Sequence, residues 1–272
     1  MNLIKMNFYR FFRMKLCYIL LLISIALVIF VVIEGKTASV ADKEAMNQYI
    51  AESAENGEES VNMKLYIYDD FSLNGVTSEI VSSQILLILM TIFVCCFINE
   101  ERTMGYIKNL TACSDSKAKI YLSKVPVIAV YSAMLLGSVI LGAIICQSTR
   151  LSCSLEVFVW FLVLQWMLHT GFGIFISMLA EVLRNQISVV VLGIAASVSI
   201  PTVILSEIMN KIPCLYDLRK YTHLLLSPLV KNLTVSDNIN TFSLKLTVIL
   251  SCLILSILSL FIGTMSIMKR DL

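Results

Sequence analysis

Few residues of this chain have types and spacing that could do chemistry. Gly35, Lys36 and Thr37 resemble the end of a phosphate-binding loop, in which backbone N–H groups hold the phosphates of a nucleotide. Such a loop also needs a glycine five residues before Gly35, and the chain has Phe30 at that position. The sequence therefore predicts that this chain does not hydrolyse ATP by itself.

Histidines and cysteines are equally poor candidates for catalysis or metal binding. The chain has only two histidines, at positions 169 and 223, and none of its eight cysteines forms a Cys-x-x-Cys pair. A Ser/His/Asp arrangement is also missing from the sequence. We therefore predict no metal site, no cofactor bound by this chain, and no enzyme.

The hydropathy of the chain indicates that long apolar helices must position its few polar residues. Of 272 residues, 58% are hydrophobic and 15% charged, whereas a soluble domain has about 25% charged residues. Six runs lack Asp, Glu, Lys and Arg, and each is long enough to cross a bilayer as a helix, which takes about 20 residues. They are Leu16–Ile33, Ile80–Ile98, Val125–Cys146, Val157–Ala180, Ile187–Ser206 and Leu246–Met268. We predict an all-α integral membrane protein, with six transmembrane helices in a single domain over 1–272.

Basic residues predict the orientation of these spans. Four Lys or Arg residues precede Leu16, which favours a cytoplasmic N-terminus, and an even number of spans returns the C-terminus to the same side. The expected location is the cell membrane, as a multi-pass protein. Segment 34–79 is then an extracytoplasmic loop, and 207–242 an outer loop or re-entrant segment. Cys153 and Cys214 would lie outside, as one disulfide or as two thiols.

Residues 2–15 have an amphipathic helical pattern. Phe8, Phe11 and Phe12 lie on one face of the wheel, and Lys5, Arg10 and Arg13 on the other. This pattern is typical of a helix that lies on the cytoplasmic leaflet, anchored by its aromatic side chains. Because short helices fray, a disordered basic flank is the alternative.

Small or polar residues recur at helical spacing within some apolar runs. In the fourth run they are Gln165, His169, Gly173 and Ser177, and in the third Ser138 and Gly142. Such residues allow close helix packing in lipid. Gln165 and His169 are also candidates for a cargo path, since polar residues within the membrane are often functional, although packing is the alternative for both. Pro201 should bend or end the fifth helix.

Segment 99–124 is the only long mid-chain stretch that mixes both signs of charge. Glu100 and Glu101 follow directly on the second apolar run, and helical spacing continues to Leu110. Ser114 or Ser116 could then cap a second short helix that leads into the third run. The segment is either an elbow that another protein binds or an ordinary cytoplasmic loop, made basic by the positive-inside rule.

This segment resembles the cytoplasmic loop of ABC-2 type transporter permeases of the bacitracin- and lantibiotic-export kind. The residues that match in register are Glu101, Gly105, Lys108, Asn109, Leu110, Ser116, Lys119, Ile120, Ser123 and Lys124. Ser114, Asp115 and Lys117 depart from the usual Gly, aliphatic residue and Arg. The amphipathic start, the six runs and the ending Lys-Arg-Asp-Leu at 269–272 are similar to that family as well.

The resemblance implies the membrane-spanning permease subunit of an ABC exporter. It would pair with a second permease, identical or related, and with two copies of a cytoplasmic ABC ATPase, which would bind the ATP and Mg²⁺. The implied coupling helix contains Glu100, Glu101, Arg102, Gly105, Tyr106, Ile107, Lys108 and Leu110. The cargo would be antimicrobial peptide or another amphipathic molecule, moved outward.

Two other functions remain open. One is an ATPase-independent secondary transporter or immunity protein, although ion-coupled transport normally needs acids within the spans, and the six runs have none. The other is a membrane-embedded enzyme. A lipid membrane is expected as a partner in every case, and nucleic acid in none.

Overall fold

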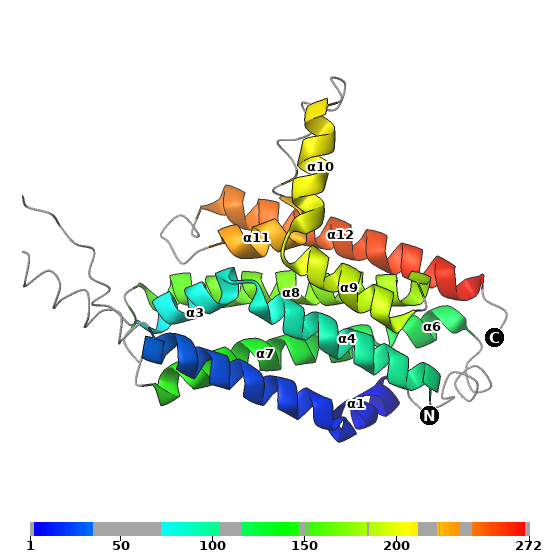
Figure 1. The fold of residues 1–272 in the computed structure, drawn as a ribbon, viewed down its shortest axis with the longest axis horizontal. Helices are drawn as coiled ribbons and strands as arrows, with labels where there is room; N and C mark the ends of the chain where they lie inside the picture. The colour runs from blue at the N-terminus through cyan, green and yellow to red at the C-terminus, as the bar shows by residue number, and fades with distance from the viewer. Residues whose placement is uncertain are drawn as a thin grey trace, which may run out of the picture.

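The structure is a computed structural model that describes residues 3–34, 72–103, 116–146, 151, 153–183, 185–211, 222, 224–233 and 241–269. The regular elements of these residues are all helices (Figure 1). They are α1 (Leu3–Arg13), the helix Lys15–Glu34, α3 (Leu73–Ser82), α4 (Ile85–Thr103), α6 (Lys117–Leu122), α7 (Val125–Ile145), α8 (Leu155–Leu183), α9 (Gln186–Ser197), α10 (Ile200–Lys211), α11 (Leu226–Asn232) and α12 (Phe242–Met268).

Several of these helices have the length and composition of membrane spans. Lys15–Glu34, Lys117–Ile145, Leu155–Leu183 and Phe242–Met268 qualify individually. The number rises to six if α3 with α4, and α9 with α10, each count as one bent span. The predicted all-helical fold is therefore confirmed for the described residues, which include four to six helices long and apolar enough to cross a membrane.

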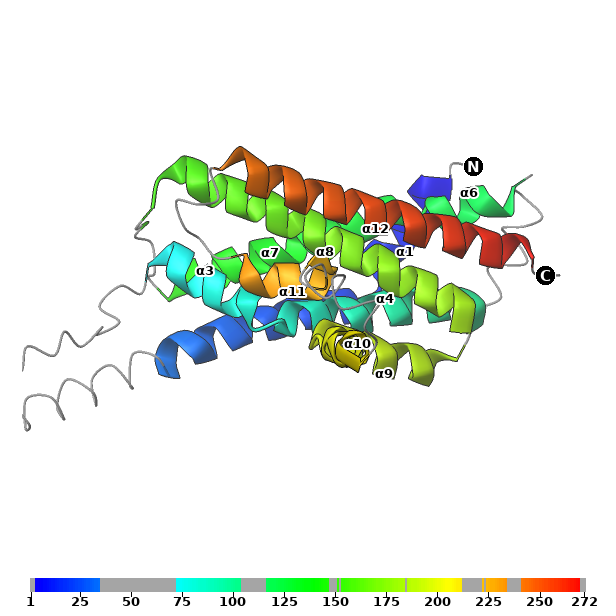
Figure 2. The ribbon, with the colours of Figure 1, turned by 90° about the horizontal axis from the view of Figure 1, so that it is seen from above.

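The long helices lie side by side, with α8 at the centre. α8 packs against α12 along most of its length and also contacts α4, α7, α9 and α11. α1 begins and α12 ends at the same end of the bundle, where α4 and α8 also end (Figures 1 and 2). We call this the N/C end. It is the arrangement that an even number of crossings produces.

Two of the predicted spans are broken helices. The second run reads as one helix from Ile80, but the chain breaks between α3 and α4 at Gln84, which has a φ of 64°, and the two parts are bent by 59°. The fifth run breaks at Ser199, with a φ of 63° and a bend of 70°. Pro201 is the second residue of α10, directly after this break, so its predicted effect on the helix is confirmed.

Hydrogen bonds join the two breaks, both directly and through Ser227 of α11. The Gln84 side-chain amide donates to the Ser199 hydroxyl at 2.9 Å, and to the carbonyl and hydroxyl oxygens of Ser227 at 3.1 Å each. Ser227 in turn donates to the Ser197 carbonyl at 2.6 Å, one of the carbonyls that the end of α9 leaves without a helical partner. We call Gln84, Ser199 and Ser227 the polar junction.

α11 lies within the segment predicted as an outer loop or re-entrant segment. Its side chains Leu226, Pro228 and Val230 are buried, and it packs against α8, α3 and α12. These residues therefore lie inside the helical bundle and not on a surface loop.

The predicted small residues do mark close helix contacts. The hydroxyl groups of Ser24 and Ser138 are hydrogen-bonded, and a Cβ at Gly142 would lie 2.9 Å from Val28 Cβ. The helix Lys15–Glu34 therefore packs closely on α7 at these positions.

Candidate functional site: a buried charge cluster at the N/C end

Five charged side chains from separate parts of the chain meet at the N/C end. Lys124 Nζ lies 3.0 Å from Glu101 Oε2 and 3.0 Å from Glu181 Oε1. Arg102 Nη2 lies 2.8 Å from Glu181 Oε2, and Arg10 Nη1 lies 3.5 Å from Glu101 Oε2. We call these residues the charge cluster. Among the described residues, the charge cluster contains three cations and two anions.

The sequence brings the charge cluster together because its members border apolar runs. Glu101 and Arg102 lie in the last turn of α4, after the second run, and Lys124 immediately precedes α7. Glu181 follows directly on the fourth run, near the end of α8. When these helices align across a membrane, their charged ends reach the same level.

Most of the charge cluster is removed from solvent. Glu101 is 1% exposed, and Lys124 and Glu181 are each 2% exposed. A buried charge is costly unless it is paired, and removing one partner of a buried pair destabilises a protein by about 3–5 kcal/mol. Glu101 Oε1 has no hydrogen-bond partner among the described residues, so this carboxylate depends on the cations beside Oε2.

Arg10 brings α1 into the charge cluster. Its guanidinium lies 5.0 Å from the centre of the Phe97 ring and donates to the Phe97 carbonyl at 3.3 Å. The sequence places this arginine on the solvent-facing side of α1, but the structure buries it together with Asn7 and Phe11. That prediction is wrong because the partner of the arginine, Glu101, is distant in sequence and satisfies its charge inside the protein.

The short helix α6 is held in place beside the charge cluster. Tyr121 hydrogen-bonds to Ser177 of α8 at 3.0 Å, and Asn7 of α1 donates to the Ser123 hydroxyl at 2.8 Å. α12 approaches the Tyr121 ring so closely that a Cβ at Gly263 would lie 2.5 Å from Tyr121 Cζ. Contacts with α1, α8 and α12 thus fix the residues that follow segment 104–115.

The predicted coupling residues divide into two groups. Glu100 and Arg102 are partly exposed, whereas Glu101 is buried against cations of its own chain. Its charge therefore faces inward, contrary to the expectation that it serves a partner protein directly. The others, Gly105, Tyr106, Ile107, Lys108 and Leu110, lie outside the described residues.

The predicted membrane anchors of α1 also divide. Phe11 is fully buried, with its ring centre 5.7 Å from that of Phe93 and 6.3 Å from that of Tyr131. Phe12 is 52% exposed, and Phe8 is partly buried against the core. Phe11 is thus a core residue, and only Phe8 and Phe12 have surface available for lipid.

Gln165 and His169, the predicted cargo-path residues, are fully buried under α11. Gln165 Nε2 donates to the carbonyls of Val230 and Leu233, at 3.2 and 3.3 Å. His169 Nδ1 lies 2.8 Å from the Gln165 carbonyl oxygen, which can only accept, so Nδ1 carries the proton. Through its two hydrogen bonds Gln165 holds the end of α11 on α8.

The sequence interpretation did not select Arg10, Lys124 or Glu181 for a charge cluster. A signal existed for two of them. Lys124 directly precedes one apolar run and Glu181 directly follows the next, so the predicted topology already places both charges at the same membrane boundary.

The described residues include no group of three or more His, Cys, Asp or Glu side chains that could hold a metal ion. In comparisons with known proteins, no family model and no curated sequence matches the chain.

Proposed function

We propose that this protein is the membrane-spanning permease subunit of an ATP-binding-cassette exporter, driven by a separate cytoplasmic ATPase. The resemblance of segment 99–124 to the coupling loop of ABC-2 type permeases supports this proposal. The structural observation that carries it is the charge cluster, which connects both sides of segment 104–115 to the helices of the bundle.

The charge cluster connects segment 104–115 mechanically to the helices of the bundle. Glu101 and Arg102 lie just before 104–115, and Lys124 lies after α6. Through Lys124, Glu101 and Glu181 the two sides are joined to each other and to α8, and Arg10 adds α1. A displacement of the segment by a partner would therefore move α1, α4, α7 and α8 together. A loop without such contacts would bend and transmit little.

In this proposal the N/C end faces the cytoplasm and the protein lies in the cell membrane. Two copies of the ATPase bind ATP and Mg²⁺, and this chain binds neither. It pairs with a second permease, identical or related, and ATP-driven closure of the ATPases opens a path between them for amphipathic or peptide cargo, including antimicrobial peptides.

Ion-coupled secondary transport is the rival function. The charge cluster does contain two buried carboxylates, which such transporters use for cations. Each already contacts cations of this chain: Glu101 pairs with Lys124 and Arg10, and Glu181 pairs with Lys124 and Arg102. An incoming cation would therefore meet repulsion.

The test is reconstitution of the protein in lipid vesicles, with and without a candidate ABC ATPase from the same organism. We expect outward movement of a fluorescently labelled amphipathic peptide only with the ATPase and hydrolysable ATP. An ATPase whose phosphate-loop lysine is replaced provides the control. Peptide movement driven by a proton or sodium gradient in vesicles that lack the ATPase would contradict the proposal.

A further inference from the structure

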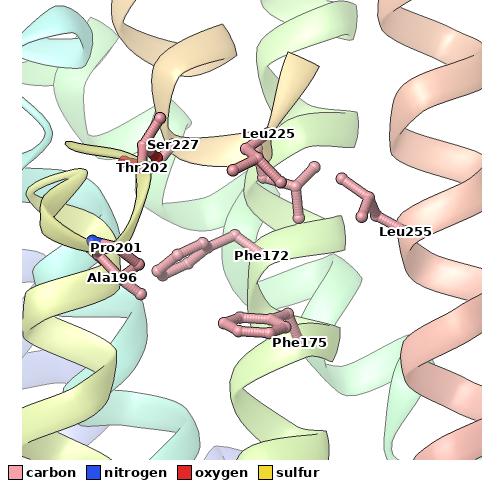
Figure 3. Close-up of a pocket in the computed structure, with 9 residues that line it drawn as sticks. Phe172, Phe175, Ala196, Pro201, Thr202, Leu225, Ser227 and Leu255 are labelled. Atoms are coloured by element: carbon pink, nitrogen blue, oxygen red, sulfur yellow. The ribbon is translucent and has the colours of Figure 1, made fainter. Parts of the chain in front are cut away.

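A cavity of about 170 Å³ lies beside the break between α9 and α10. Phe172 and Phe175 of α8 lie at its centre, with Ala196 of α9 and Pro201 on the side toward which the two rings point and Leu255 of α12 on the other side (Figure 3). The apolar lining also includes Leu225 and Leu226. Phe172 is three residues beyond His169, so the cavity lies about one turn further along α8 than the predicted cargo-path residues.

The broken fifth run creates this space. α10 bends away by 70° after Ser199 and leaves the side of α8 that a continuous helix would have covered. Ser227, which also lines the cavity, belongs to the polar junction, and its hydroxyl is engaged with Ser197, Ser199 and Gln84. The same hydrogen bonds that join the two helix breaks therefore hold one wall of the cavity.

One polar group of the lining is not engaged in this way. Thr202, in the first turn of α10, lines the cavity, and its hydroxyl has no hydrogen-bond partner among the described residues. A hydroxyl both donates and accepts hydrogen bonds, so it can bind an alcohol, an amide or an amine. The cavity thus combines an aromatic and aliphatic wall with one available hydrogen-bonding group.

Size and chemistry together define what would fit. An engineered apolar cavity of about 150 Å³ holds a benzene molecule. We propose that this cavity binds a ring-sized apolar group with a hydrogen-bonding atom beside it, as part of a small amphipathic molecule. A lipid acyl chain offers no polar group to Thr202 and is the alternative occupant that the test must exclude.

The test uses the full chain in lipid nanodiscs, without any ATPase, so its result is independent of the proposed function. The probe is 4-(trifluoromethyl-diazirinyl)benzyl alcohol, a photoreactive ring with one hydroxyl. We expect labelling of the peptides around 172–175 and 196–202 that saturates and is displaced by excess benzyl alcohol. Labelling that rises in proportion to probe concentration, as on lipid-facing helices, would overturn the inference.

Substitutions distinguish binding of the probe in the cavity from labelling by probe dissolved in the surrounding lipid. Ala196→Trp should fill the cavity and remove the saturable labelling, whereas Val191→Trp, at a 60% exposed position of the same helix, should retain it. Leu255→Trp fills the space from α12 and replaces Ala196→Trp if that variant does not fold. Thr202→Val should weaken binding of the alcohol probe about tenfold, the loss expected for a hydrogen bond of about 1–1.5 kcal/mol. Saturable labelling that survives both filling variants would contradict the proposal.

Discussion

The ammonium group of Lys124 lies 3.0 Å from the carboxylate of Glu101, so the residues before and after segment 104–115 are joined by a direct ion pair. Both side chains are almost fully buried, and Lys124 also pairs with Glu181. The residues on both sides of segment 104–115 are therefore held by contacts with the helical bundle.

Loss of the central cation should destabilise the protein strongly. Lys124→Met leaves the carboxylates of Glu101 and Glu181 buried without their shared partner, and we expect a loss of about 3–5 kcal/mol in the free energy of unfolding. Thermal unfolding of the purified protein in detergent measures it. The control is Lys119→Met, because Lys119 is exposed on the neighbouring α6. Equal unfolding temperatures for the two variants would show that the charge cluster contributes little.

The aromatic residues of α1 should differ sharply in their effects. Phe11→Ala removes a fully buried ring, so it should cost about 3–5 kcal/mol. Phe12→Ala, at a half-exposed position, should change stability by less than about 1 kcal/mol. The two unfolding temperatures provide the comparison. If Phe12→Ala is the more damaging, α1 depends on lipid contact more than on the core.

The approach of α12 to α6 should be sensitive to a single methyl group. Gly263→Ala places a Cβ against the Tyr121 ring and should destabilise by about 1–3 kcal/mol. The matched control is Gly137→Ala in α7, where an added Cβ meets no atom within 4 Å and helix propensity favours alanine. Adding Tyr121→Ala to Gly263→Ala should make the pair non-additive. If the stability losses of Gly263→Ala and Tyr121→Ala simply add in the double variant, the contact between these two residues does not determine how closely α12 packs on α6.

Much of the fold could be predicted, because lipid requires long uncharged helices. α7 and α12 end within one residue of their predicted apolar runs. The break at Gln84 was missed, because no charge interrupts the second run there and Gln84 is not a glycine, the residue that most readily adopts a positive φ. The break at Ser199 was predicted only through Pro201.

The charge cluster was harder to predict for a different reason. A helical wheel assigns every charge of a short amphipathic helix to water, so Arg10 was placed outside. Its true environment depends on Glu101, whose position is fixed only by packing of α1 against α4 and α7. The residue pattern of α1 alone cannot predict the contact between Arg10 and Glu101. The contact between Lys124 and Glu181 could have been predicted, because the predicted topology places both residues at the ends of apolar runs on the same side of the membrane.

The topology has its own test. In a variant without native cysteines, Ser53→Cys should react with a membrane-impermeant thiol reagent on intact cells, because the expected outer loop contains it. Ser116→Cys should react only after the cells are opened. Labelling of intact cells at 116 but not at 53 would invert the proposed orientation.

In the proposed function, segment 104–115 binds the ATPase and the charge cluster transmits the movement of this segment to the helices. Tyr106 and Ile107 offer the contact surface in this proposal. The chain contains other Tyr-Ile pairs, and one of them, Tyr66 and Ile67, lies in the expected outer loop. The double variant Tyr106→Ala, Ile107→Asp is therefore compared with Tyr66→Ala, Ile67→Asp.

The deciding measurement is the amount of ATPase that co-purifies with each variant, per molecule of folded permease, when both proteins are expressed together. We expect the 106/107 variant to lose at least about nine-tenths of the bound ATPase, because removal of about 1.4 kcal/mol or more of binding free energy has this effect at limiting ATPase concentration. The 66/67 variant should keep it all. Undiminished ATPase on the 106/107 variant would show that segment 104–115 does not bind the ATPase.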